Sequence, residues 1–243
     1  MDQETELVEH LDELRKRVLI VGTSFLAFFI LGFVFVEQIY QWLVKDLDSK
    51  LALLGPTDIL WIYFKIAGVV AMAFTIPMAA YHTWKFVLPA IEERQRKATL
   101  MLIPALFLLF VSGIGFGYAI VFPTVLSFLQ KISNEGFQLF YTTEKYFNFL
   151  FQMTIPFGLL FEMPVVILFL TVLGILNPAR LKKSRKICYF VFTILAVMLT
   201  PPDFFSDILV LMCLIILFEV SITLSGFVYR KKNEKAKAWD FTS

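Results

Sequence analysis

Six apolar runs, nearly free of charged residues, dominate the chain. They cover residues 18–36, 59–81, 98–122, 146–176, 187–202 and 208–229. Because a helix needs about 20 apolar residues to cross the hydrocarbon core of a bilayer, these runs predict six transmembrane helices. The fifth run rises only about 24 Å at 1.5 Å per residue, against roughly 30 Å of hydrocarbon, and the sixth is also marginal. We therefore expect an all-α polytopic membrane protein whose fifth and sixth helices are short.

The composition supports a lipid environment and excludes several functions. The chain is 58% hydrophobic and 17% charged, whereas soluble domains carry about 25% charged residues. Its net charge of +2 is too small to indicate a nucleic-acid partner. The sequence has no phosphate-binding loop or histidine cluster, and Cys188 and Cys213 lie in apolar runs. We expect no enzymatic activity, no cofactor and no metal site.

The distribution of lysine and arginine predicts how the helices are oriented. Basic residues gather in alternate segments, at positions 15–17, 85–97, 180–186 and 230–237. The other connections contain only Lys45, Lys50, Lys131 and Lys145, and residues 201–207 contain no base. Since cytoplasmic loops carry the excess of basic residues, both termini are predicted to be cytoplasmic. The whole chain, 1–243, then forms one membrane domain with an amphipathic amino-terminal segment at 5–17 and a cytoplasmic tail at 230–243.

Several local patterns predict finer structure. Asn177 followed by Pro178 is typical of a helix start, which predicts a short basic helix before the fifth span. Gly113 and Gly117 form a GxxxG pair, which indicates close helix packing far more often than a ligand site. Residues 123–131 predict a short helix on the outer surface. Prolines inside the spans predict kinks and hence a curved bundle; they are Pro77, Pro104, Pro156 and Pro164.

Two acidic residues lie inside predicted spans. Glu162 is the only charged residue between Lys145 and Arg180, and Glu219 lies in the sixth span. A charge at the centre of a membrane helix costs roughly 2.5–3.5 kcal/mol on insertion scales, so such residues usually have a function and a partner. For Glu219, a packed neutral carboxyl is at least as plausible an interpretation as a site.

Charged clusters near the predicted cytoplasmic face are the other candidates. Residues 9–17 combine an apolar helical face with Glu13 and Arg17, whose spacing of four also fits a simple intrahelical pair. In the connection at 86–97, Phe86 and Pro89 precede Glu92 and Glu93, an arrangement that also suits an interfacial loop and helix cap.

Four segments together carry a family resemblance. They are residues 10–17 (HLDELRKR), 86–90 (FVLPA), 161–164 (FEMP) and 199–203 (LTPPD). In this order, with six spans, they resemble the signatures of TatC, the receptor subunit of the twin-arginine protein translocase. Residues 204–207 (FFSD) are similar to its Gram-positive branch.

The resemblance implies a function and a set of partners. TatC-like proteins of the bacterial cytoplasmic membrane bind signal peptides with two consecutive arginines and recruit single-span TatA-type subunits. They export folded proteins using the proton-motive force. The resemblance further implies a homo-oligomeric assembly with a concave face for the signal peptide, and leaves a TatB-type partner open.

The resemblance also implies which residues contact the arginines. Glu13 would be one carboxylate acceptor and the first cytoplasmic loop would supply the other, near Phe86 and Pro89, with Arg17 part of the same segment. The family usually places a glutamate where this chain has Gln95, so Glu92 and Glu93 are the expected substitutes. Carboxylates are suitable acceptors for these arginines, because a guanidinium presents a planar fork of donors that matches a carboxylate.

Glu162 has two candidate roles. By the resemblance it would dock a polar group of a TatA-type helix, and desolvation would favour its neutral form in the free protein. Lys65 matches a family lysine and would reach the outer interface. Lys65, Asp203 and Glu219 are further candidates for structural or functional roles.

The alternative function is a small proton-coupled transporter that uses Glu162 and Glu219 as a relay. A scaffold without transport activity is a third possible function.

Overall fold

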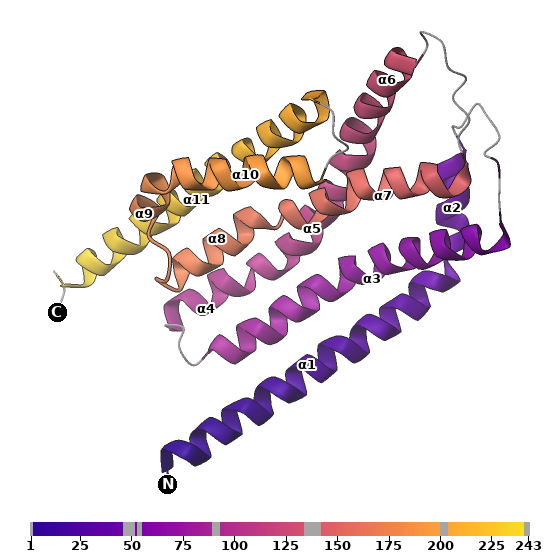
Figure 1. Cartoon of the computed structure of the whole chain (residues 1–243). Helices are drawn as coiled ribbons and strands as arrows, with labels where there is room; N and C mark the ends of the chain where they lie inside the picture. The colour runs from indigo at the N-terminus through magenta and orange to yellow at the C-terminus, as the bar shows by residue number, and fades with distance from the viewer. Residues whose placement is uncertain are drawn as a thin grey trace. The chain divides into compact units, whose positions relative to one another are not determined.

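The computed structural model describes residues 2–45, 52, 55–88, 93–133, 142–199 and 204–240, which are almost entirely helical (Figure 1). The chain divides into two compact units. The first comprises Met1–Phe107 and Tyr141–Asn148, and the second Leu108–Phe140 and Phe149–Ser243. Among the described residues, five helices are long and apolar enough to cross a membrane. The prediction of an all-α polytopic membrane protein is confirmed.

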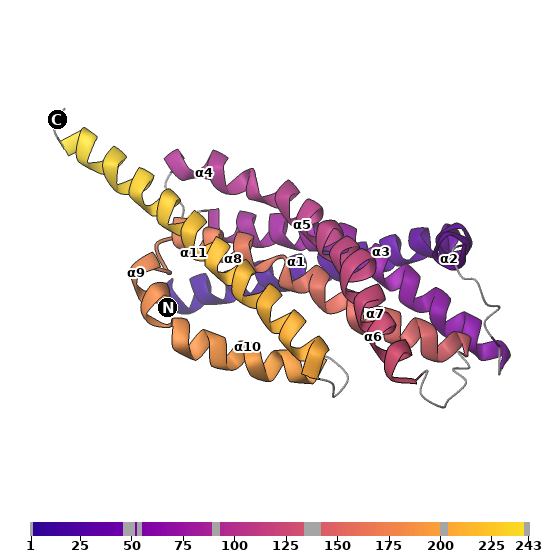
Figure 2. The same ribbon diagram turned by 90° about the horizontal axis from the view of Figure 1, so that it is seen from above.

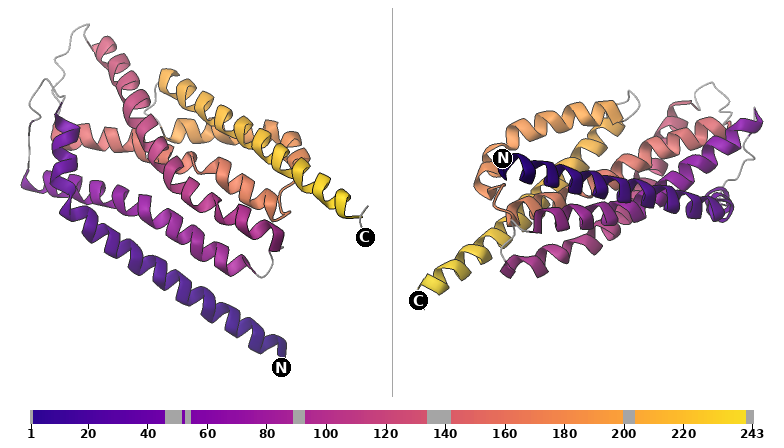
Figure 3. Two further views of the ribbon diagram at one scale, coloured as in Figure 1. Left: turned by 180° about the vertical axis from the view of Figure 1, so that it is seen from behind. Right: turned by 90° about the horizontal axis from the view of Figure 1, so that it is seen from below.

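In the first unit, α1 (Asp2–Val34) and α3 (Pro56–Val87) run antiparallel and lie side by side (Figures 1 and 3). Aromatic side chains fill much of the contact, with the Phe29 and Phe64 rings stacked at 5.9 Å between centroids. The short α2 (Val36–Val44) also packs on α3. The predicted amphipathic segment at 5–17 is not separate from the first span, since α1 is one continuous helix. No proline or glycine lies between Asp2 and Val21 to interrupt it.

The start of α3 is fixed by a local cap. The backbone N–H of Gly55 donates to Oδ2 of Asp58 at 3.1 Å, and Pro56 occupies the first helical position, where its missing N–H is not needed. A β-bridge joins Ala52 to Thr142, and the N–H of Thr143 donates to the carbonyl of Ala52 at 2.9 Å. With α3 covering Pro56–Val87, the second span is longer at both ends than the predicted 59–81.

The third span and the predicted outer helix are consecutive helical segments without a loop between them. They comprise α5 (Leu102–Phe116), a π turn η2 (Gly117–Val121) and α6 (Phe122–Ser133). The π turn ends two residues before Pro123, which has no backbone N–H to donate a hydrogen bond. A helix does form at 123–131 as predicted, but it continues the third span.

The fourth span is divided into α7 (Thr143–Leu160) and α8 (Met163–Val172). The predicted GxxxG packing is confirmed, because α5 and η2 approach α7 at Gly113 and Gly117. A Cβ built on Gly113 would lie 2.9 Å from the Cα of Gly158. Farther along, Thr171 of α8 shares a buried 2.7 Å hydrogen bond with Ser225 of α11.

The chain ends in three helices of the second unit: α9 (Pro178–Lys183), α10 (Arg185–Leu199) and α11 (Phe204–Asp240) (Figure 2). The predicted helix start is confirmed, since Oδ1 of Asn177 accepts from the N–H of Ala179 at 2.9 Å. The fifth helix is short as predicted, with 15 residues, or about 22 Å. The sixth is longer than predicted: its apolar part, Phe204–Arg230, has 27 residues. The lysine-, glutamate- and alanine-rich residues that follow favour helix and extend it to Asp240.

Candidate functional site

Arg17 is the centre of a small cluster between α1 and α3. Its Nη1 donates to the backbone carbonyl of His82 at 2.5 Å, and its Nη2 pairs with the carboxylate of Glu13. Its guanidinium carbon lies 5.6 Å from the centroid of the Phe86 ring, within the range of a cation–π interaction. Only 12% of the Arg17 side chain is exposed. The guanidinium of Arg17 is therefore fixed in position by its contacts with His82, Glu13 and Phe86.

A pocket of about 230 Å³ opens beside this cluster. Its walls are mostly apolar and come from both helices, with Arg17 the single charged residue among them; they are Leu14, Arg17, Val18, Val21, Ala79, His82, Thr83 and Phe86. The pocket therefore offers an apolar surface directly next to a charged pair.

Glu13 keeps hydrogen-bonding capacity in this arrangement. About half of its side chain is exposed, and Arg17 contacts only one of its two oxygens. A carboxylate offers about four acceptor positions. Neighbouring Asp12 forms a separate, more exposed pair with Lys16 at 2.8 Å. The predicted intrahelical pair of Glu13 and Arg17 is confirmed, and Glu13 can accept further donors.

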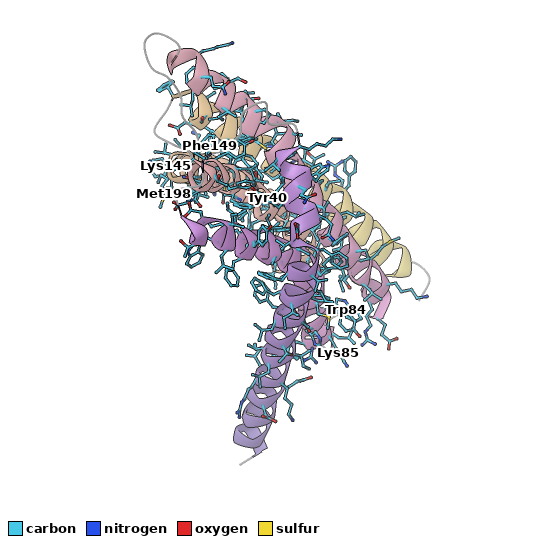
Figure 4. All side chains as sticks on the ribbon, turned by 90° about the vertical axis from the view of Figure 1, so that its right-hand side faces the viewer. Tyr40, Trp84, Lys85, Lys145, Phe149 and Met198 are labelled. Atoms are coloured by element: carbon cyan, nitrogen blue, oxygen red, sulfur yellow. The ribbon has the colours of Figure 1, made fainter. Side chains whose placement is uncertain are left out.

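A second group of polar contacts fixes α4 (Glu93–Leu100) against α3. Nε1 of Trp84 donates to Oγ1 of Thr99 at 2.8 Å, and that hydroxyl donates to the carbonyl of Arg96. Figure 4 shows Trp84 and Lys85 close together on α3, away from Tyr40 on α2. Glu93 is 3.6 Å from Arg96, and its side chain is 90% exposed. The carboxylate of Glu93 is thus open to a ligand.

The remaining loop candidates are not placed by the structure. Pro89, Glu92 and Asp203 lie outside the described residues, and so does the side chain of Gln95, although its backbone belongs to α4. Pro201 and Pro202 of the LTPPD segment also lie outside them. That Glu92 or Glu93 takes the role of the glutamate which the family usually has at the position of Gln95 therefore remains a prediction.

Glu162 occupies the break between α7 and α8. Its own carbonyl accepts from the N–H groups of Val165 and Val166, at 3.1 and 3.0 Å, so α8 starts from it. Pro164 follows in the first turn of α8, where a proline is tolerated. The residue is 8% exposed, and neither carboxyl oxygen has a hydrogen-bond partner among the described residues. Buried polar groups are nearly always satisfied, so this carboxyl is an exception within the described part of the chain.

Glu219 has partners of its own. Its Oε2 accepts from Nη2 of Arg185 and its Oε1 from the hydroxyl of Tyr189, both at 2.6 Å. Both partners lie on α10, so the carboxylate ties that short helix to α11. Glu219 is therefore packed and hydrogen-bonded within its unit, and whether it also has a functional role remains a prediction.

Lys65 is likewise bonded within its unit. Its Nζ donates to Oδ1 of Asn148, which lies at the start of α7 and also contacts Glu144 at 3.4 Å. Lys65 therefore anchors α3 to the beginning of α7.

A family model for the Sec-independent protein translocase protein TatC matches residues 9–212. The chain belongs to the TatC family. The predicted resemblance is confirmed, and the chain is a multi-pass membrane protein of this family.

Other members of the TatC family match nearly the whole chain. The Sec-independent protein translocase protein TatCd of Bacillus subtilis (strain 168) is 52% identical, over 97% of this chain and 98% of the relative. TatC of Escherichia coli (strain K12) is 32% identical, over 93% and 90%. A crystal structure of the twin-arginine translocase receptor TatC is 29% identical, covers 90% of this chain and 98% of that one, and superposes with a TM-score of 0.75. The higher identity to Bacillus subtilis fits the predicted branch.

Two residues of this TatC-family chain were missed by sequence reasoning. Asn148, the partner of Lys65, lies 83 positions away in the chain, so no local pattern links them. Thr154 of α7 has a buried Oγ1 without a partner among the described residues. A threonine inside an apolar run gives no signal until packing shows what surrounds it.

Proposed function

We propose that this chain is the signal-peptide receptor and core subunit of a twin-arginine translocase. The observation that carries the proposal is Glu13, a half-exposed carboxylate held by an enclosed arginine at the rim of an apolar pocket. Paired guanidinium groups of a signal peptide are suitable donors for it, because an Arg fork binds a carboxylate through two parallel hydrogen bonds. The family match makes this reading preferable to the proton-coupled transporter, which has no support among the relatives.

The pocket beside Glu13 is proposed to receive apolar side chains of the signal peptide. Its lining comes from Leu14, Val18 and Val21 of α1 and from Ala79 and Phe86 of α3. A bound peptide would cover this surface while its arginines reach Glu13 and Glu93. The orientation assumed is the predicted one, with both termini cytoplasmic in a bacterial cytoplasmic membrane.

Glu162 is proposed to dock a TatA-type subunit. Its two buried oxygens accept no hydrogen bond from the described residues, so a polar group of a partner helix would relieve an unfavourable desolvation. Recruitment of such subunits, the proton-motive force as energy source and a homo-oligomeric assembly complete the proposal.

Peptide binding to the purified protein tests the receptor role. Wild type is compared with Glu13→Gln for a twin-arginine peptide and for the same peptide with two lysines. We expect Glu13→Gln to weaken twin-arginine binding about tenfold, which is the ~1.4 kcal/mol of one charge-assisted hydrogen bond, and to affect the twin-lysine peptide much less. Glu92→Gln combined with Glu93→Gln should give the same selectivity.

Asp12→Asn is the matched control, because Asp12 neighbours Glu13 and is equally exposed but pairs with Lys16. Equal losses for the two peptides, or equal losses in the control, would contradict the assignment of Glu13. Proton uptake by the protein alone in liposomes would instead favour the transporter.

A further inference from the structure

A basic pocket lies in the second unit, between the short helix α9 and the later part of α11, two elements that pack together (Figure 1). Its volume is about 380 Å³, which is within the range of small-ligand sites. It shares no residue with the Arg17 cluster or with Glu162. Nothing in the proposed receptor function uses it.

Three cations line this pocket: Lys182 of α9, Arg185 at the start of α10 and Arg230 of α11. No acidic residue is among its described lining residues. Lys182 and Arg230 are exposed, and neither pairs with a carboxylate in the part of the chain whose side chains are described. The pocket therefore concentrates positive charge that the described residues do not neutralise.

Arg185 has donors that its own ion pair does not use. Glu219 accepts from Nη2, while a guanidinium has five N–H groups. The Nε–H of Arg185 is buried and lacks an acceptor among the described residues. An oxygen-rich anion in the pocket would satisfy this group, and phosphate oxygens suit an arginine fork.

Part of the pocket lining is apolar. Ile222, Gly226 and Phe227 of α11 form it, and the Phe227 side chain is largely exposed, at 67%. Cations next to an exposed aromatic ring match a molecule with a phosphate head and a hydrocarbon chain. Basic pockets beside transmembrane helices are typical sites for anionic lipid head groups.

We propose that the pocket lined by Lys182, Arg185 and Arg230 binds the phosphate of an anionic phospholipid whose acyl chain lies along Phe227. Because α9, α10 and α11 all meet at this pocket, the lipid would bridge them where the short α10 begins. The inference depends on the chain's being a membrane protein and is independent of signal-peptide binding.

Native mass spectrometry of the purified, delipidated protein tests this site, with phosphatidylglycerol, phosphatidylcholine and inorganic phosphate added separately. We expect phosphatidylglycerol to bind much more tightly than phosphatidylcholine. Lys182→Gln combined with Arg230→Gln should weaken phosphatidylglycerol binding about 25-fold, at roughly fivefold for each cation near the membrane surface. Arg230→Lys, which keeps the charge, should retain most of the binding.

Lys183→Gln combined with Lys186→Gln is the matched control, since both lysines are exposed, lie nearby and do not line the pocket. This pair removes the same charge and should leave binding close to wild type. The proposal is overturned by equal binding of the two lipids or by an equal loss in the control pair. It is also overturned if inorganic phosphate alone binds as tightly as phosphatidylglycerol, which would make the pocket a site for free phosphate.

Discussion

Gly117 of the π turn and Thr154 of α7 approach so closely that a Cβ on Gly117 would lie 2.8 Å from the Cα of Thr154. Backbone atoms cannot move aside as a flexible side chain can, so this contact sets the distance between the two helices. The nearby Gly115 differs, because a Cβ there would meet nothing within 4 Å. The helices therefore depend on glycine at one position and tolerate a side chain two residues away.

Gly117→Ala is expected to destabilise the protein by about 1–3 kcal/mol, the usual cost of overpacking. Gly115→Ala is the control and should be neutral or stabilising by up to about 1 kcal/mol, because alanine favours helix over glycine. Thermal unfolding of both variants in the same detergent measures the difference. Equal melting temperatures for the two variants would contradict the close-packing argument.

This glycine contact belongs to the part of the fold that the sequence predicts well. The GxxxG spacing, the Asn177 cap and the short fifth helix follow from local chemistry, and the structure confirms them. The boundaries of α1 and α11 were predicted less well, because hydropathy marks where a helix enters lipid and not where its hydrogen bonds stop. Polar helix-forming residues extend α1 and α11 well beyond their apolar parts.

The candidate site could be predicted only in part. Residues four apart, such as Glu13 and Arg17, meet on one helix, and their pairing follows from spacing alone. The carbonyl of His82, which completes the Arg17 cluster, is 65 positions away. The partners of Glu219 could not be predicted for the same reason, since Arg185 and Tyr189 are 34 and 30 residues distant. Long-range contacts of this kind depend on packing.

Arg17→Lys is expected to weaken twin-arginine peptide binding severalfold while keeping the positive charge. A lysine ammonium cannot donate to Glu13 and His82 as a planar fork, so Glu13 would no longer be held at the rim of the pocket. Lys16→Gln, on an exposed pair of the same helix, should have little effect. Peptide titration of both variants checks this, and unchanged affinity in Arg17→Lys would show that Arg17 does not position Glu13.

Tyr189→Phe is expected to destabilise the protein by about 1–2 kcal/mol, because it removes one hydrogen bond to the carboxyl of Glu219 and little else. In Glu219→Gln the same tyrosine change should cost less, since the carboxyl acceptor has already gone. A double-mutant cycle in thermal or denaturant unfolding measures this coupling. Additive effects would show that Tyr189 and Glu219 do not interact in the membrane.

Glu162→Leu is expected to raise the stability of the isolated protein and to abolish protein export. The carboxyl is buried without a partner among the described residues, so replacing it with an apolar side chain of similar length should stabilise the isolated protein by about 1–3 kcal/mol. If the carboxyl docks a partner helix, the same variant should lose crosslinking to the TatA-type subunit and protein export, while keeping twin-arginine peptide binding.

Thr154→Val is the control for Glu162→Leu, because it also removes a buried, unsatisfied oxygen from the same unit, with almost no change of shape. It should leave stability equal or slightly higher and leave export unchanged. Unfolding, crosslinking and export measured on both variants decide between two roles for Glu162. A stable Glu162→Leu protein that still recruits the subunit normally would show that this carboxyl is not the docking group, and that its burial must serve another purpose.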